Sequence, residues 1–188
     1  MSNELSYVAF SKTRVLAEGA LSEVLPALFR VRKKDASEIV LVFENETGRA
    51  VDFDLRKPMD RILEEHGVGA PKGPGRPKLG VTSREVTLLP RHWDWLERQP
   101  SGASAALRRL VEAAIKHEPG KERARRTRAA LSSILSAIAG NRPNYEEACR
   151  ALFAGEDERF DALVDRWPRD IRAYASRRSR EAAAQERG

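Results

Sequence analysis

The side chains best suited to chemistry in this sequence are basic, and they gather in one stretch. Between Lys72 and Arg128 the chain holds 14 basic and 6 acidic residues, whereas all 188 residues hold 34 and 28. The formal net charge of +6 therefore comes from this stretch. An excess of Lys and Arg confined to one segment is typical of a protein that binds a polyanion. We expect phosphate contacts here, and the alternative is a solvated basic face without a partner.

Side chains for bond-making chemistry are few. The histidines His66, His92 and His117 each stand alone near an expected helix end, and Cys149 is the single cysteine. Neither H-x-x-x-H nor C-x-x-C nor an acidic cluster with metal-ligand spacing occurs. The glycines near Gly73 lack the strand-then-helix context of a phosphate loop. The sequence therefore predicts no enzyme, no catalytic residue, no metal and no cofactor.

Three elements should position the basic stretch. Residues 82–89, TSREVTLL, are rich in residues that favour strands. A helix should begin at Pro90, because proline suits the first helical position, and end at Pro100. A second helix should follow, with Ser101 or Ser104 as its N-cap. Its apolar residues recur at helical spacing, namely Leu107, Leu110, Val111, Ala114 and Ile115.

This strand–helix–helix order over residues 81–115 resembles the ribbon-helix-helix DNA-binding superfamily. In that family two chains pair their strands into an antiparallel ribbon, which enters the major groove of double-stranded DNA. The alternative is a strand in an ordinary mixed domain. The resemblance implies a homodimer whose core holds the apolar side chains of the segment, namely Val86, Leu88, Trp93, Leu96, Leu107, Leu110 and Val111.

The resemblance also implies which side chains read base edges. In one register these are Ser83, Glu85 and Thr87, while Arg84 faces inward or curls over the edge. A slip of one residue reverses the two faces, so the register stays open. Glu85 departs from the expected pattern, because DNA repels a carboxylate unless cytosine donates to it. The backbone N–H groups from Gly102 to Ser104 would hold a phosphate at a helix N-terminus.

Residues 74–78, PGRPK, resemble the core of an AT-hook. In that motif an arginine lies extended in the narrow minor groove of A·T tracts. The usual core has two arginines around one glycine, and Pro74 stands where the first would be. The resemblance implies a DNA-binding arm beside the ribbon, with Lys72, Arg76 and Lys78 as its cations. The alternative is a flexible basic linker, which Gly and Pro also favour.

A third group of cations opens the helix expected over residues 121–139, whose first half reads KERARRTR. The N-terminus of a helix disfavours cations, so an external anion would relieve an unfavourable charge. The alternative is a solvated helical turn. We expect contacts along DNA phosphates from Arg123, Arg125, Arg126 and Arg128.

The chain as a whole predicts an α+β protein of four segments. They are an N-terminal α+β domain over 1–66, a basic Gly/Pro linker over 67–80, a DNA-binding and dimerisation segment over 81–117, and a C-terminal helical domain over 118–188. The first should be a β-β-α-β-β unit, with strands over 6–10, 13–17, 38–44 and 49–55 and a helix over 20–33. The last should be a bundle of short helices, over 121–139, 145–153, 156–167 and 168–184. Its basic end, Arg177, Arg178 and Arg180, should be solvated.

Two runs, RPKLGVTSREVTLLPRHWDWL and FDALVDRWPRDIRAYA, are similar to an uncharacterised bacterial family that is known as a domain of unknown function. Such a resemblance implies no activity. The sequence has no apolar run of 18 residues and no secretory signal. A single cysteine fits a reducing compartment. We therefore expect a cytoplasmic, nucleoid-associated protein with no membrane partner.

Two functions remain open at this stage. One is a DNA-binding homodimer, either a transcriptional regulator or a nucleoid-associated protein. The other is a protein-interaction module or antitoxin-like adaptor, which would dimerise through the ribbon without binding DNA. For the N-terminal domain the expected roles are dimerisation, binding of a protein partner or sensing of a small ligand, and the alternative is a packing and interaction module.

Overall fold

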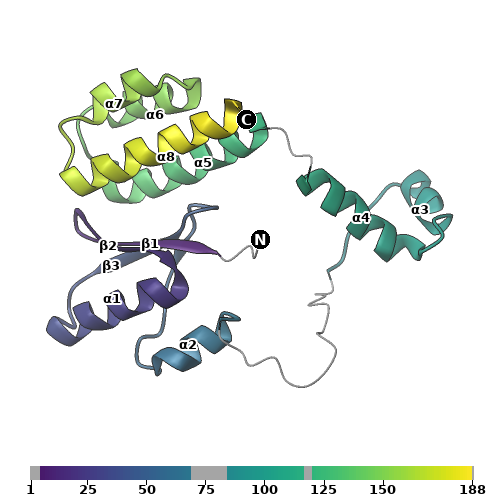
Figure 1. Ribbon diagram of the computed structural model, residues 1–188, viewed down its shortest axis with the longest axis horizontal. Coiled ribbons are helices and arrows are strands. Elements are labelled where there is room, and N and C mark those ends of the chain that lie inside the picture. The colour runs from purple at the N-terminus through teal and green to yellow at the C-terminus, as the bar shows by residue number, and fades with distance from the viewer. Residues whose placement is uncertain (1–4, 69–83, 117–119, 188) are drawn as a thin grey trace. The chain divides into compact units, whose positions relative to one another are not determined.

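The computed structural model describes residues 5–68, 84–116 and 120–187. The chain divides into two compact units. Unit 1 comprises Met1–Ala70 together with Gly120–Gly188, and unit 2 comprises Pro71–Pro119. Unit 2 is therefore inserted, in the sequence, between the two parts of unit 1. The elements of both units are labelled in Figure 1.

Unit 1 contains a four-stranded antiparallel sheet with the strand order β2-β1-β3-β4. The central strand β1 pairs with both of its neighbours, so Val8 lies opposite Glu18 on one side and Phe43 on the other. The predicted α+β class is confirmed, because the sheet is combined with helices. The strands are β1 Ser6–Ser11, β2 Arg14–Ala20, β3 Val40–Glu44 and β4 Ala50–Val51.

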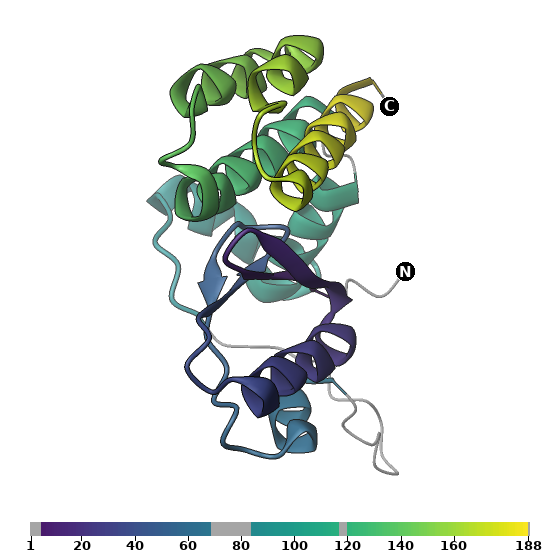
Figure 2. The same cartoon turned by 90° about the vertical axis from the view of Figure 1, so that its left-hand side faces the viewer.

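Helices cover both faces of this sheet (Figure 1; Figure 2). One face is covered by α1 and α2, which follow β2 and β4 in the chain. The other face is covered by four helices from the C-terminal part of the chain, of which α5 and α8 lie nearest the sheet. The bounds of these helices are α1 Leu21–Lys34, α2 Met59–Glu65, α5 Gly120–Ala139, α6 Tyr145–Ala154, α7 Asp157–Val164 and α8 Arg169–Arg187.

Two cores explain why β1 is apolar along almost its whole length. Tyr7 and Ala9 pack into the core shared with α1 and α2, whereas Val8 and Phe10 pack into the core shared with α5 to α8. Successive side chains of a strand point to opposite faces, so a strand covered on both faces has no polar side. The Phe10 ring meets the Tyr174 ring of α8 edge-on, with 5.4 Å between centroids.

The two segments predicted to be separate N-terminal and C-terminal domains thus share one core in unit 1. The turn between β3 and β4 shows how closely they meet. Gly48, with φ +69°, accepts a hydrogen bond from the Ser133 hydroxyl of α5 at 3.1 Å. A Cβ at Gly48 would lie 2.3 Å from the Ala130 carbonyl oxygen. Only glycine therefore fits both the left-handed backbone and this approach to α5.

The helix boundaries of unit 1 lie close to those expected from the sequence. Gly155, with φ +72°, ends α6 as predicted. The helix α7 is shorter than predicted, since it ends at Val164 and not at Trp167. Among the described residues, no helix combines the length and the apolar character needed to cross a membrane.

Candidate nucleic-acid interface

The described part of unit 2 contains an extended segment, residues 84–89, which two helices follow in the chain. The helix α3, Pro90–Glu97, begins at Pro90 as predicted, and the N–H group of His92 donates to the Leu89 carbonyl at 2.8 Å. The helix α4 spans Gly102–Lys116, and its first residue, Gly102, has a φ of +73°. Residues 84–89 have no regular secondary structure, although a strand was predicted over 82–89. A strand needs a second strand to bond with, and within the described part of the chain no strand pairs with residues 84–89.

The interior of unit 2 is small. Leu96 of α3 and Ala106 of α4 are buried against each other's helices, and Trp93 and Leu107 are half-buried. Beside them lies an open groove of about 280 Å³ between the two helices and the extended segment. Its lining is apolar apart from one imidazole, and consists of Leu88, His92, Trp95, Leu96, Leu107 and Leu110.

Of the seven apolar side chains predicted for the dimer core, three are exposed, three are half-buried and Leu96 is buried. Val86 is 52% exposed, Leu110 50% and Val111 55%, whereas Leu88 is half-buried. Ile115, one turn beyond Val111, is 68% exposed. Within α4 the apolar stripe is therefore present at helical spacing, but only Ala106 is buried. An apolar face of this kind on a soluble helix is typical of a contact surface.

The side chains predicted to read bases are only partly within the described residues. Arg84, Glu85 and Thr87 lie on the surface of unit 2, and no strand fixes which of them share a face. Ser83 and the AT-hook-like cations Lys72, Arg76 and Lys78 lie outside the described residues. Their predicted roles therefore stay predictions.

The predicted phosphate-holding turn lies at the start of α4. Gly102 is the first residue of the helix, and Gly102 and Ser104 are both exposed. The first turn of α4 has no acidic side chain. The Gly102 N–H group already donates to the Gln99 carbonyl at 3.0 Å, so the predicted phosphate contact would fall to the N–H groups that follow it, at the positive end of the helix dipole.

The four arginines predicted to follow DNA phosphates belong to α5, in unit 1. Arg125 is exposed and pairs with Glu122 at 3.8 Å, Arg126 is exposed, and Arg123 is half-buried. Arg128 is placed differently, because its side chain is buried and its guanidinium donates to Glu186 of α8 at 2.7 Å. A phosphate cannot reach a buried and paired guanidinium, so the contact predicted for Arg128 is inconsistent with its position.

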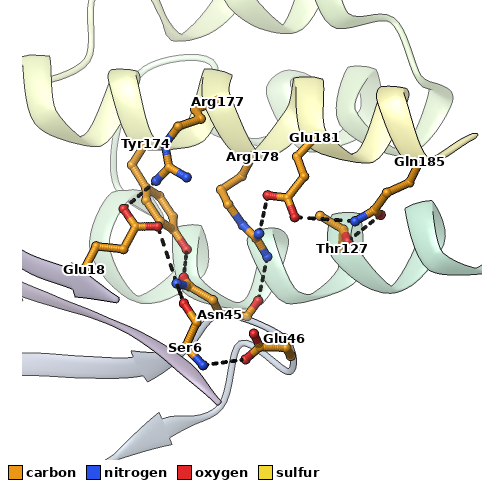
Figure 3. A network of polar contacts seen from close by, with 10 residues as sticks. All are labelled: Ser6, Glu18, Asn45, Glu46, Thr127, Tyr174, Arg177, Arg178, Glu181 and Gln185. Carbon is orange, nitrogen blue, oxygen red and sulfur yellow. Dashed lines mark hydrogen bonds and ion pairs between the residues drawn. The ribbon is translucent and has the colours of Figure 1, made fainter. Parts of the chain in front are cut away.

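A network of polar contacts in unit 1 was not anticipated from the sequence (Figure 3). Its hub is Asn45, which directly follows β3. The Asn45 side-chain amide donates to the Ser6 hydroxyl at 2.7 Å, and its carbonyl oxygen accepts from the Tyr174 hydroxyl at 2.8 Å. Burial raises the pKa of the Tyr174 phenol far above its ordinary value, so the group stays a neutral donor.

The basic end of α8 takes part in the same network, so the prediction that its arginines are solvated is wrong for Arg178, whereas Arg177 and Arg180 are exposed. Arg178 is buried, donates to the Asn45 backbone carbonyl at 2.7 Å and pairs with Glu181. Arg177 pairs with Glu18 of β2 and lies over the Tyr174 ring. These contacts join α8 to the sheet across more than a hundred residues of sequence, and we interpret their role as structural.

A comparison with protein families places the chain. Residues 6–179 match a family described as "Uncharacterized protein conserved in bacteria (DUF2239)". The chain belongs to this family. The DUF2239 match runs through unit 2 and through both parts of unit 1, so it includes the candidate interface as well as the two-sided sheet. Neither a curated protein nor a solved structure matches the chain.

The description of the DUF2239 family carries no activity, so the geometry of the chain must support any function. Within residues 5–68, 84–116 and 120–187, no group of three or more His, Cys, Asp or Glu side chains is placed to hold a metal ion. The apolar face and the cations of unit 2 remain the features that a function must explain.

Proposed function

We propose that the chain forms a homodimer through unit 2 and that this dimer binds double-stranded DNA, as a transcriptional regulator or a nucleoid-associated protein. The observation that carries the proposal is the uncovered apolar face of α4, with Leu110, Val111 and Ile115 at least half exposed. Burial of apolar area is the main favourable term in protein association. A second copy of unit 2 would bring an identical face, as a two-fold symmetric interface requires.

The extended segment supports the same arrangement. Residues 84–89 lead directly into α3 and carry exposed Val86, and their order before two helices resembles the ribbon-helix-helix superfamily. In a dimer the two segments would pair as an antiparallel ribbon, in which each backbone would hydrogen-bond to the other. One face of the ribbon, with Glu85 and Thr87, would enter the major groove.

Positive charge supports DNA as the ligand. Residues 71–119 hold nine basic and five acidic residues. The N-terminus of α4 would bind a backbone phosphate, and Arg125 of α5 would add a contact that reads no sequence. The AT-hook-like residues 74–78 would lie in the minor groove beside the ribbon.

The proposal is tested on the purified full-length protein by fluorescence anisotropy with A·T-rich and mixed duplexes at increasing salt. We expect affinity to fall about 10³-fold or more between 50 and 200 mM salt, because phosphate contacts release counterions. Light scattering on the same samples should give the mass of a dimer. A blank result with both duplexes at low salt, or a monomeric mass, would contradict the proposal.

A pair of variants separates base reading from phosphate contact. Thr87→Ala should change the preference among duplex sequences, because its side chain would face base edges. Arg125→Ala should weaken binding to all duplexes evenly and reduce the salt slope by about 1. Equal effects of the two variants on every duplex would argue against a ribbon in the major groove.

A second candidate function rests on the groove of unit 2. Its lining is apolar, and Trp95 is half exposed at its edge. Tryptophan is enriched among the residues that dominate protein interfaces. The chain would then be a protein-interaction module or antitoxin-like adaptor that dimerises without DNA. A dimeric mass together with no duplex binding at low salt would favour this function.

A further inference from the structure

Unit 1 carries two kinds of surface cation, which differ in whether a carboxylate lies beside them. Many arginines are paired, such as Arg49 with Glu44 at 2.6 Å, Arg159 with Glu156 at 2.8 Å and Arg180 with Asp161 at 2.6 Å. A second group surrounds the end of α1 and the turn between β1 and β2. Among the described residues, none of this group forms an ion pair: Lys12, Arg14, Arg30, Arg32, Lys33 and Lys34.

Three cations of this second group line a groove of about 280 Å³ on unit 1. Arg14 comes from β2, and Arg30 and Lys34 lie one turn apart on α1. We call this feature the α1–β2 groove. Its remaining lining is apolar except for one carboxylate, and consists of Leu16, Ala27, Val31 and Glu38.

The carboxylates near the α1–β2 groove are already engaged by hydroxyl and amide groups. Glu38 accepts a hydrogen bond from the Ser11 hydroxyl. Asp35 accepts from the Ser37 hydroxyl at 2.6 Å and from the Ser37 N–H group at 2.9 Å, and the hydroxyl contact is the main cause of its lowered pKa. Neither acid forms an ion pair with the cations of the groove, and the three cations and Glu38 leave its lining with a formal charge of +2.

The local structure accounts for only part of this charge. The negative end of the α1 dipole stabilises Arg32, Lys33 and Lys34, which stand in the last turn of the helix. That effect falls off within one turn, so it does not explain Arg30. Arg14 belongs to another element. Cations from two elements converge on this groove, and the single carboxylate in its lining, Glu38, offsets only one of the three charges, so their repulsion would be relieved by a bound anion.

We propose that the α1–β2 groove is a second DNA contact of this protein, in which Arg14, Arg30 and Lys34 bind backbone phosphates without reading sequence. This inference rests on the proposed function, because it assigns the same ligand to a second surface. Guanidinium groups form paired hydrogen bonds with phosphate oxygens, and an ammonium group adds a point charge. Such contacts supply affinity that depends on salt and not on base sequence.

The lining of the groove favours a backbone phosphate over a free nucleotide. None of the described side chains that line it is aromatic, so a base would have no ring to stack on. The groove is open to solvent, which suits a chain of phosphates that passes across the surface. A free nucleotide would need a base-binding subsite that this lining does not provide.

The test compares two triple variants of the full-length protein with the same loss of charge. R14Q/R30Q/K34Q removes the cations of the groove. The matched control R150Q/R159Q/R172Q removes three arginines of α6, α7 and α8 that are each paired with a carboxylate. Binding to a 30-base-pair duplex is measured against salt by fluorescence anisotropy, and circular dichroism verifies that both variants fold.

The groove variant should reduce the slope of log K against log salt by about 2 to 3, since each phosphate contact contributes about 0.9. The control should reduce it by less than about 1. Equal slopes in the two variants would overturn the inference while the proposed function stands. Binding to anionic lipid vesicles is measured in parallel. A groove variant that binds duplex normally but loses binding to these vesicles would also overturn the inference. If the unaltered protein binds no duplex at low salt, the proposed function fails first and the ligand assigned to the groove fails with it.

Discussion

Unit 1 and unit 2 differ in how far their apolar side chains are buried. In unit 1 the sheet is covered on both faces, and side chains such as Val8, Phe10 and Leu131 are fully buried. In unit 2 the helix α4 has a regular apolar stripe, yet only Ala106 is buried. One unit completes its core within a single chain, and the other presents a surface that a second molecule can cover. Amphipathic spacing therefore identifies an apolar face, but it does not show whether the chain itself covers that face.

The largest expected effect concerns the exposed apolar stripe of unit 2. Val111→Glu would place a carboxylate on the apolar stripe of α4, and a symmetric dimer would contain it twice. Since burial of an unpaired charge is costly, we expect the dimer dissociation constant to rise more than about 100-fold. Analytical ultracentrifugation over a range of concentrations measures it. Val111→Leu is the matched control and should remain dimeric; a dimer of unchanged affinity in the glutamate variant would show that another surface pairs the chains.

The second largest expected effect concerns the buried polar network around Asn45 in unit 1. Arg178→Met removes the donor to the Asn45 carbonyl and the partner of Glu181 from a buried position. We expect the free energy of unfolding to fall by about 3 kcal/mol, as when one partner of a buried charged contact is lost. Arg180→Met, two residues on, removes an exposed pair with Asp161 and should cost less than about 1 kcal/mol. Urea unfolding compares the two, and equal losses would mean that the Asn45 network does not join the halves of unit 1.

The smallest effect concerns pH. Glu44, at the end of β3, accepts from the Arg49 guanidinium at 2.6 Å, and this hydrogen bond is the main reason that its pKa is lowered. A lowered folded-state pKa gives stability that is complete above the usual pKa of 4.5 and is lost as pH falls through the folded value. Unfolding measured between pH 6 and 3 should therefore depend less on pH in Glu44→Gln than in the unaltered protein. Identical pH profiles would rule out a contribution from this pair.

The sequence predicted elements more successfully than it predicted how they assemble. The sequence predicted the start of α3 at Pro90 and the end of α6 at Gly155. Proline and glycine mark helix ends because each has its own allowed backbone conformations, which do not depend on distant residues. No local signal showed that Arg178 is buried, since its partner Asn45 stands 133 residues away. The same distance in sequence hid the shared core of unit 1, which was predicted as two domains.

The candidate interface was predictable to a similar degree. The stripe of α4 was read from its spacing, because periodicity depends only on neighbouring residues. The strand predicted over 82–89 is not found in its described part, because residues 84–89 have no regular secondary structure and β-propensity alone does not supply a pairing partner. The α1–β2 groove was missed because Arg14 and Arg30 approach each other only when β2 and α1 pack together.

The insertion of unit 2 also has a consequence for biosynthesis. The helices that cover Val8, Phe10 and Phe43 follow unit 2 in the chain, so the ribosome makes them after unit 2. Until α8 has left the exit tunnel, the nascent sheet has one bare face, and the Asn45 side chain lacks Tyr174 as its donor. A premature stop codon within residues 71–119 would thus release a polypeptide with an unprotected sheet, which chaperones and proteases would recognise as incomplete.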